Sequence, residues 1–299
     1  MKRYRAYVMF FLLLSCSPLV TDLEVRRISD TRLTIEEYGR IWLDSLCSSS
    51  MMGRRSGTVG DSLACMYLLD VVSQMGYEPK LVSFQTEQGK TLRNIEIIIP
   101  GTTDSLAVIG AHYDGAVMSH DSVHYSAAED NGSGTVALLM LLMSLREKTN
   151  PRSIICCFWD GEEYLDGKVF QGSDFFVKNM SNQTRNQVLF YFNLDTIGHI
   201  HENNPAIYFD YKGDERTKRA AYRLSENGFL EYVTAERVKP PASDYASFGK
   251  VGIPFLSLHD HSDFTCEHPN HSINDTPDAI SIERLVCVSK SVSEMIRIY

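Results

Sequence analysis

The sequence lacks an excess of basic residues: 29 lysines and arginines stand against 38 aspartates and glutamates, a formal charge of −9. Nucleic-acid-binding proteins normally carry a basic surface, so this balance argues against nucleic acid as a partner. Seven cysteines in 299 residues are too few for a disulfide-stabilised scaffold. Internal repeats, heptad patterns and low-complexity tracts are also missing, which excludes solenoids and coiled coils. The remaining composition, 43% hydrophobic and 22% charged, is typical of a globular protein.

An apolar run long enough to form a transmembrane helix is missing too. Ala6–Leu14 has nine residues, and as a helix it would rise only about 13 Å, against roughly 30 Å for the hydrocarbon core of a bilayer. Basic residues precede this run, and Leu13-Leu14-Ser15-Cys16 at its end resembles the bacterial lipobox. We therefore expect residues 1–20 to be a lipoprotein signal peptide with lipidation at Cys16, followed by a spacer over 21–32. Membrane contact would then come only through this anchor, in the cell envelope; the alternative is an ordinary cleaved signal peptide and a secreted protein.

The rest of the chain, 33–299, alternates apolar strand-like runs with helical patterns and contains no Pro/Gly-rich linker. This alternation predicts a single α/β domain with a mostly parallel, twisted central sheet and helices on both faces. Two adjacent cysteines, Cys156 and Cys157, lie in one predicted strand and should point to opposite faces of the sheet. The predicted strands are 80–85, 95–100, 106–112, 153–159, 188–194, 206–210 and 253–259. The predicted helices are 33–46, 61–75, 135–146, 169–179, 215–227 and 282–298.

Polar residues that could act in catalysis or bind a metal follow the predicted strands. Ligands bind outside the carboxyl ends of the strands in open α/β sheets, so these residues should gather at one edge. Each segment has a plain alternative, such as a helix cap, a turn or a solvated acidic pair. Imidazole and carboxylate groups at several strand ends are, however, the ligands that zinc prefers. The segments are Ala111-His112-Tyr113-Asp114, Glu129-Asp130-Asn131-Gly132-Ser133-Gly134, Asp160-Gly161-Glu162-Glu163, Asn193-Leu194-Asp195-Thr196 and His271-Ser272-Ile273-Asn274-Asp275-Thr276.

In order and spacing these segments resemble the co-catalytic zinc aminopeptidases, the family that also contains the glutaminyl cyclases. The resemblance extends from Gly53-Arg54 to the final predicted helix and includes Ser243-Asp244-Tyr245 before the last predicted strand. It implies a zinc exopeptidase-like fold, a peptide substrate and two Zn²⁺ ions.

The resemblance also assigns roles to residues. His112 and Asp195 would bind one ion, Glu163 and His271 would bind the other, and the carboxylate of Asp130 would bridge the two. The resemblance also implies a cis peptide bond between Asp130 and Asn131, which would present this carboxylate to both ions. Glu162 would be the general base that accepts a proton from a metal-bridged water and later passes it to the leaving amine. Asp114, two residues after His112, would accept the other N–H of that histidine and orient it.

Two other functions remain open. A glutaminyl-peptide cyclotransferase with a single zinc would keep many of the same residues, but cyclases tend to carry a tryptophan immediately before the last ligand histidine, where this chain has Asn270. A non-catalytic peptide-binding lipoprotein would be expected to lose Glu162 or a metal ligand. The sequence does not indicate the oligomeric state, the pairing of Cys266 or the substrate side chain, which loops 116–125, 198–204 and 260–270 would contact.

Overall fold

The structure is a computed structural model of the chain. It describes residues 33–116, 125–146, 148–199, 207–213, 215–226, 233–236, 243–259 and 270–298. The expected signal peptide (1–20) with Cys16 and the expected spacer (21–32) lie outside these residues. Within the described ranges, no helix combines the length and the apolar character that a membrane crossing requires.

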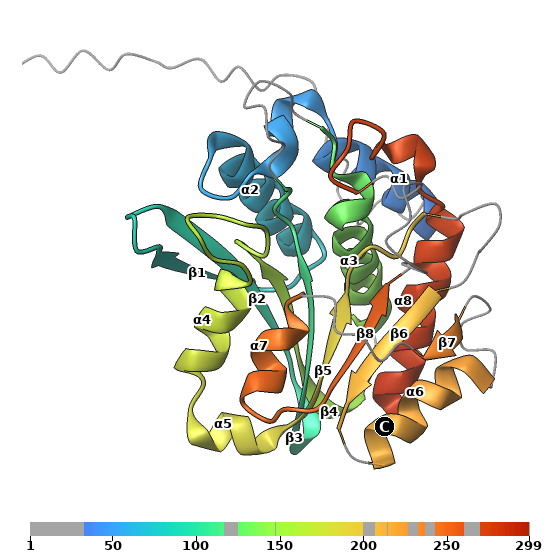
Figure 1. The fold of residues 1–299 in the computed structure, drawn as a ribbon. Coiled ribbons are helices and arrows are strands. Elements are labelled where there is room, and N and C mark those ends of the chain that lie inside the picture. The colour runs from blue at the N-terminus through green and yellow to red at the C-terminus, as the bar shows by residue number, and fades with distance from the viewer. Residues whose placement is uncertain are drawn as a thin grey trace, which may run out of the picture.

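A single eight-stranded sheet forms the centre of the molecule, with the strand order β1-β2-β4-β3-β5-β8-β6-β7 (Figure 1). Its four middle strands, β4, β3, β5 and β8, are parallel to one another. Antiparallel pairing is confined to the outer strands, where β1 pairs β2, β2 pairs β4 and β6 pairs β8. The predicted α/β class with a parallel central sheet is therefore confirmed. The strands are β1 (Lys80–Gln85), β2 (Thr91–Ile99), β3 (Gly101–His112), β4 (Asn150–Trp159), β5 (Val188–Leu194), β6 (Ile207–Lys212), β7 (Val233–Glu236) and β8 (Phe255–His259).

Helices cover both faces of the sheet, and each face has its own apolar core. Cys156 packs in the core shared with α1, α2, α3 and α8, whereas Cys157 packs in the core shared with α4 and α7. The two cysteines thus point to opposite faces, as predicted, and both are fully buried thiols. The helices are α1 (Ile35–Leu46), α2 (Val59–Gln74), α3 (Gly134–Leu145), α4 (Gln171–Asn179), α5 (Asn182–Gln187), α6 (Glu215–Glu226), α7 (Tyr245–Lys250) and α8 (Ile282–Ile298), with the short turns η1 (Ser49–Arg54), η2 (Ala128–Ser133) and η3 (Pro277–Ala279).

Local sequence explains where several elements begin and end. Thr34 caps α1 and forms a capping box with Glu37, and Gly76 follows α2 with a φ of +85°, which suits a residue without a Cβ. The predicted strand 95–100 proved too short, because the first half of β2 pairs with β1 across a tight turn. Short elements without a clear apolar period, α5, α7 and β7, were not predicted.

Candidate metal centre

The central strands bring the predicted site residues to one edge of the sheet. Register places His112, the last residue of β3, opposite Trp159 of β4, and Gly110 opposite Asn193 of β5. Asp195, two residues after Asn193, therefore lies level with His112. The loop after β4 carries Glu162 and Glu163 over the same edge. Three neighbouring parallel strands thus supply four of the expected residues from their carboxyl ends.

The first group of possible ligand atoms surrounds the Nε2 atom of His112. Oδ1 of Asp195 lies 3.3 Å from this nitrogen, and Oε2 of Glu162 lies 3.9 Å from it. The ligand atoms of these three residues all lie within 4.8 Å of one another. Glu162 was expected to act as a base without binding the metal. Its carboxylate nevertheless lies close enough to His112 and Asp195 to be a third possible ligand.

The second group consists of Asp130, Glu163 and His271. Nε2 of His271 lies 3.0 Å from Oε1 of Glu163 and 3.0 Å from Oδ2 of Asp130. The other oxygen of Asp130, Oδ1, lies 3.3 Å from Nε2 of His112 in the first group. The carboxylate of Asp130 therefore faces both groups, one oxygen to each, which is the arrangement expected of a bridging ligand.

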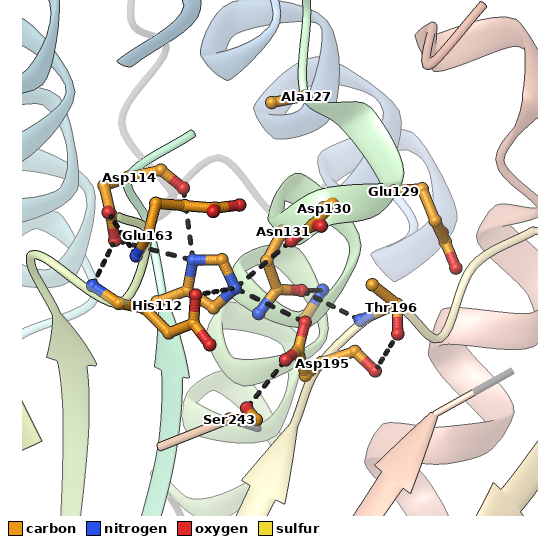
Figure 2. A network of polar contacts seen from close by, with 12 residues as sticks. His112, Asp114, Ala127, Glu129, Asp130, Asn131, Glu163, Asp195, Thr196 and Ser243 are labelled. Carbon is orange, nitrogen blue, oxygen red and sulfur yellow. Dashed lines mark hydrogen bonds and ion pairs between the residues drawn. The ribbon is translucent and has the colours of Figure 1, made fainter. Parts of the chain in front are cut away.

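The Asn131 side chain fixes the turn that carries Asp130. Its amide group donates to the backbone oxygen of Leu194 at 2.9 Å, and its oxygen accepts hydrogen bonds from the backbone N–H groups of Gly134 and Thr196. These contacts join η2 to the end of β5, beside Asp195 (Figure 2). The peptide bond between Asp130 and Asn131 is cis, as the resemblance predicts.

Asp114 contacts the other ring nitrogen of His112, as expected, and also a second part of the site. Nδ1 of His112 lies 3.1 Å from the backbone oxygen of Asp114 and 3.5 Å from its carboxylate (Figure 2). The fully buried carboxylate also accepts hydrogen bonds from the backbone N–H groups of Glu162 and Glu163, at 3.2 and 3.1 Å, and from the Ser56 hydroxyl at 2.6 Å. Asp114 thus orients the histidine through its backbone and the glutamate pair through its side chain.

A chain of buried hydrogen bonds orients Asp195. The Trp159 indole donates to the Tyr191 hydroxyl, which donates to the side-chain oxygen of Asn193. The Asn193 amide donates to the Ser243 hydroxyl at 2.9 Å, and Ser243 donates to Oδ2 of Asp195 at 2.7 Å. Because Oδ2 is engaged in this way, Oδ1 is the atom directed at His112.

Two further carboxylates support the turn that holds Asp130. Asp275 accepts hydrogen bonds from the backbone N–H groups of Glu129 and Asp130, at 2.6 and 3.2 Å. The carboxylate of Glu129 is fully buried and accepts hydrogen bonds from the backbone N–H groups of Gly198 and His199. Asp275 was noted in the sequence without a clear role, and this contact gives it one.

Burial and close charges shift the pKa values of the acids at this site. Burial raises the pKa of Glu162 well above its usual value; the charge of His112 opposes this, and the nearby carboxylates of Glu163 and Asp195 add to it. Burial likewise raises the pKa of Glu163 to about 7. For Asp130 burial acts in the same direction, but hydrogen bonds from His112 and His271 outweigh it and hold the pKa well below the usual range.

The donor set fits zinc. Each group combines one imidazole with carboxylates, the ligand types that zinc takes in proteins.

The sequence alone did not identify Asp244, a buried acid near the site. Asp244 is fully buried, burial raises its pKa to about 7, and its charge contributes to the raised pKa of Glu162. Its position in the Ser243-Asp244-Tyr245 segment was the one available signal. Most of the loops expected to contact the substrate side chain, namely residues 117–124, 200–204 and 260–269 with Cys266, lie outside the described residues.

A parallel α/β sheet with two imidazoles around a shared carboxylate at the carboxyl edge of its strands defines the class of α/β proteins with a candidate metal centre at that edge. Within that class, the chain belongs to peptidase family M28, whose family model matches residues 94–296. The family expected from the sequence is confirmed.

Known proteins are similar to the chain in sequence and in fold. An aminopeptidase of Pseudomonas aeruginosa is 28% identical over 177 residues, which cover 53% of this chain and 29% of that protein. The chain thus matches about three tenths of this curated relative's length. A zinc aminopeptidase from Bacillus subtilis shares the fold with a TM-score of 0.74 and 14% identity, over 87% of this chain and 94% of that one. A glutaminyl cyclase from an Acidobacteriales bacterium does so with a TM-score of 0.73 and 22% identity, over 88% and 94%.

Proposed function

We propose that this protein is a zinc-dependent aminopeptidase that removes N-terminal residues from peptides. The observation that carries the proposal is the carboxylate of Asp130, whose two oxygens lie 3.3 Å from His112 and 3.0 Å from His271. A carboxylate shared between two complete ligand groups suits two ions rather than one. Membership of peptidase family M28 and the similarity to an aminopeptidase support the same reaction.

In this proposal His112 and Asp195 hold one ion, Glu163 and His271 hold the other, and Asp130 bridges them. When bound, zinc supplies Lewis acidity, which lowers the pKa of a water molecule and polarises a carbonyl group. Glu162 accepts the proton of the attacking water and passes it to the leaving amine. Its backbone N–H is held by Asp114, and its buried position, 7% exposed, makes its carboxylate a stronger base than an exposed one.

Glutaminyl cyclisation is the second candidate, because the fold is equally similar to that of a glutaminyl cyclase. A single-zinc cyclase needs only one of the two ligand groups, whereas this chain has an imidazole and carboxylates in both. The direct test is to assay the purified protein against a panel of aminoacyl chromogenic substrates and against glutaminyl peptides. Release of the chromophore supports the aminopeptidase. Cyclisation of glutaminyl peptides without hydrolysis would overturn it in favour of the cyclase, and activity on neither panel would favour a peptide-binding protein.

We also propose that the chain is attached to the cell envelope by a lipid at Cys16. The lipobox-like Leu13-Leu14-Ser15-Cys16 supports this location. Incorporation of a labelled fatty acid into the wild type, and its loss with release from the membrane fraction in Cys16→Ala, is the expected result. Equal membrane association of the two proteins without label would contradict it.

A further inference from the structure

The segment Arg54–Ser56 connects η1 to α2 and lies behind the candidate metal centre. Arg54 is fully buried. Its guanidinium donates hydrogen bonds to four backbone oxygens, those of Leu46, Tyr113, Ser126 and Ala127, at 2.7–2.9 Å. These four oxygens belong to three different parts of the chain, so one side chain connects three separate segments.

Two of those segments carry candidate ligands. Tyr113 directly follows His112, and Ala127 lies three residues before Asp130. The backbone N–H of Gly115 also donates to the backbone oxygen of Arg54 at 3.2 Å. A planar guanidinium has five N–H groups in a fixed arrangement, so it sets the distance and angle between the groups that it binds. Arg54 therefore determines how the loop after β3 lies relative to η2.

The bond to Ala127 holds an unfavourable backbone conformation in place. Ala127 has a φ of +51° and Arg54 itself a φ of +55°, in the left-handed region that residues with a Cβ rarely adopt. Such conformations persist only where surrounding contacts enforce them. Without the guanidinium, the chain before Asp130 would be free to relax.

Ser56 is connected through Asp114 to the segment that carries Glu162 and Glu163. Its hydroxyl donates to Oδ2 of Asp114 at 2.6 Å, and the Asp114 carboxylate in turn accepts the backbone N–H groups of Glu162 and Glu163. Ser56 is nearly fully buried. Its bond restricts the rotation of the carboxylate on which the Glu162–Glu163 turn depends.

We propose that the Arg54–Ser56 segment is a positioning element of the metal centre. Arg54 sets the bridging Asp130 relative to His112, and Ser56 sets the turn that carries Glu162 and Glu163. Neither residue is a metal ligand. The inference rests on the metal centre of the proposed function, and the segment lies outside residues 94–296, the part that the family model matches. A purely structural segment would affect stability; a positioning element must also affect metal affinity and coordination geometry.

The test compares Ser56→Ala and Arg54→Lys with two controls that remove similar contacts elsewhere. Ser289→Ala removes a buried hydroxyl that donates to Val286 within α8, and Arg152→Lys alters an arginine that donates to Ile296 at the opposite end of the sheet. The readouts are zinc affinity by competition with a chromogenic chelator, the visible absorption spectrum of the Co²⁺-substituted protein, and the melting temperature.

We expect Ser56→Ala and Arg54→Lys to bind zinc roughly 10–100-fold more weakly, the usual effect of removing a contact that orients metal ligands, and to change the Co²⁺ spectrum. The controls should lower the melting temperature by a similar amount and leave affinity and spectrum unchanged. Ser56→Ala alone decides the question if Arg54→Lys does not fold. Wild-type zinc affinity and an unchanged spectrum in Ser56→Ala would overturn the inference. These readouts need no substrate, so a wild-type protein that binds zinc without hydrolysing peptides would overturn the proposed function separately.

Discussion

Asp275 lies directly behind Asp130, and its Oδ2 accepts the hydrogen bond that the backbone N–H of Asp130 donates, at 3.2 Å. Its other oxygen accepts the neighbouring N–H of Glu129 at 2.6 Å. The carboxylate thus satisfies two consecutive N–H groups of η2 while the side chain of Asp130 points toward the two histidines. A residue outside the candidate ligand set therefore determines which way the bridging ligand faces.

Asp275→Asn tests this contact. The amide offers one oxygen and one NH₂ group, so one buried backbone N–H must lose its acceptor. We expect a loss of roughly 1–3 kcal/mol in the free energy of unfolding, measured by urea denaturation, because an unsatisfied buried donor costs about that much. Zinc affinity should fall as well. Asp278→Asn, in the exposed turn η3, is the control and should change neither quantity; a wild-type free energy of unfolding in Asp275→Asn would show that this contact is dispensable.

The roles of the two adjacent glutamates can be separated by metal content. Glu162→Gln keeps its shape but cannot accept a proton, so it should retain both zinc ions and lose about 10²–10⁴ in kcat. Glu163→Gln should lose zinc from one site and recover part of its activity in excess zinc. Elemental analysis and kcat, measured for both variants at the same zinc concentration, decide between the roles. Since Glu162 lies 3.9 Å from Nε2 of His112, loss of zinc from Glu162→Gln alone would make it a ligand and reverse the assignment.

Carefully purified protein should contain two zinc ions per chain, and removing them should destabilise it. Ions that bind only the folded state stabilise it by mass action, about 2.7 kcal/mol per site at a free zinc concentration 100 times the dissociation constant. A melting curve with and without chelator measures this loss, and added zinc should restore the wild-type curve. A firm content of one zinc per chain with full activity would instead favour the single-zinc cyclase.

Stability should fall as pH rises from about 4 to about 7, in part because of Asp61. Burial raises the pKa of Asp61 to about 7 from its usual value of 3.8, and the charge of Asp114 adds to the increase. In that pH window the folded state therefore holds a proton that the unfolded state releases, and the free energy of unfolding decreases with pH; above pH 7 both states are ionised and this dependence ends.

Asp61→Asn should remove this contribution and flatten the slope by at most about 1.4 kcal/mol per pH unit. Urea denaturation at several pH values between 4 and 8, in excess chelator, measures it. Asp44→Asn, at an exposed carboxylate on α1, is the control and should keep the wild-type slope. An Asp61→Asn slope identical to the wild-type slope would show that this carboxyl is ionised throughout.

Local patterns were sufficient to predict the four central parallel strands, and with the family resemblance they pointed to the candidate site residues. Val188–Leu194 was predicted with its observed bounds, because a continuous apolar run followed by Asp195 marks a strand buried on both faces. His112, Asp195 and the Glu162–Glu163 pair end or follow such strands, so their meeting at one edge of the sheet could be inferred from the sequence, whereas Asp130 and His271 were placed by the family resemblance.

Long-range contacts could not be predicted in this way. The four oxygens that Arg54 binds lie between 8 and 73 positions away, and nothing in the residues around Arg54 specifies them. The sequence assigns no role to Glu129, yet its carboxylate accepts hydrogen bonds from backbone N–H groups about 70 positions later. Such partners are selected by the packing of the whole sheet.

The candidate ligands come from β3, from η2, from the loops after β4 and β5, and from the segment before α8. A chain that ends before His271 lacks part of the second group, because this histidine lies close to the C-terminal helix. A growing chain that has not yet reached His271 therefore lacks the complete set of candidate ligands. Under the proposed function, peptide hydrolysis is therefore expected only once synthesis and folding are nearly complete.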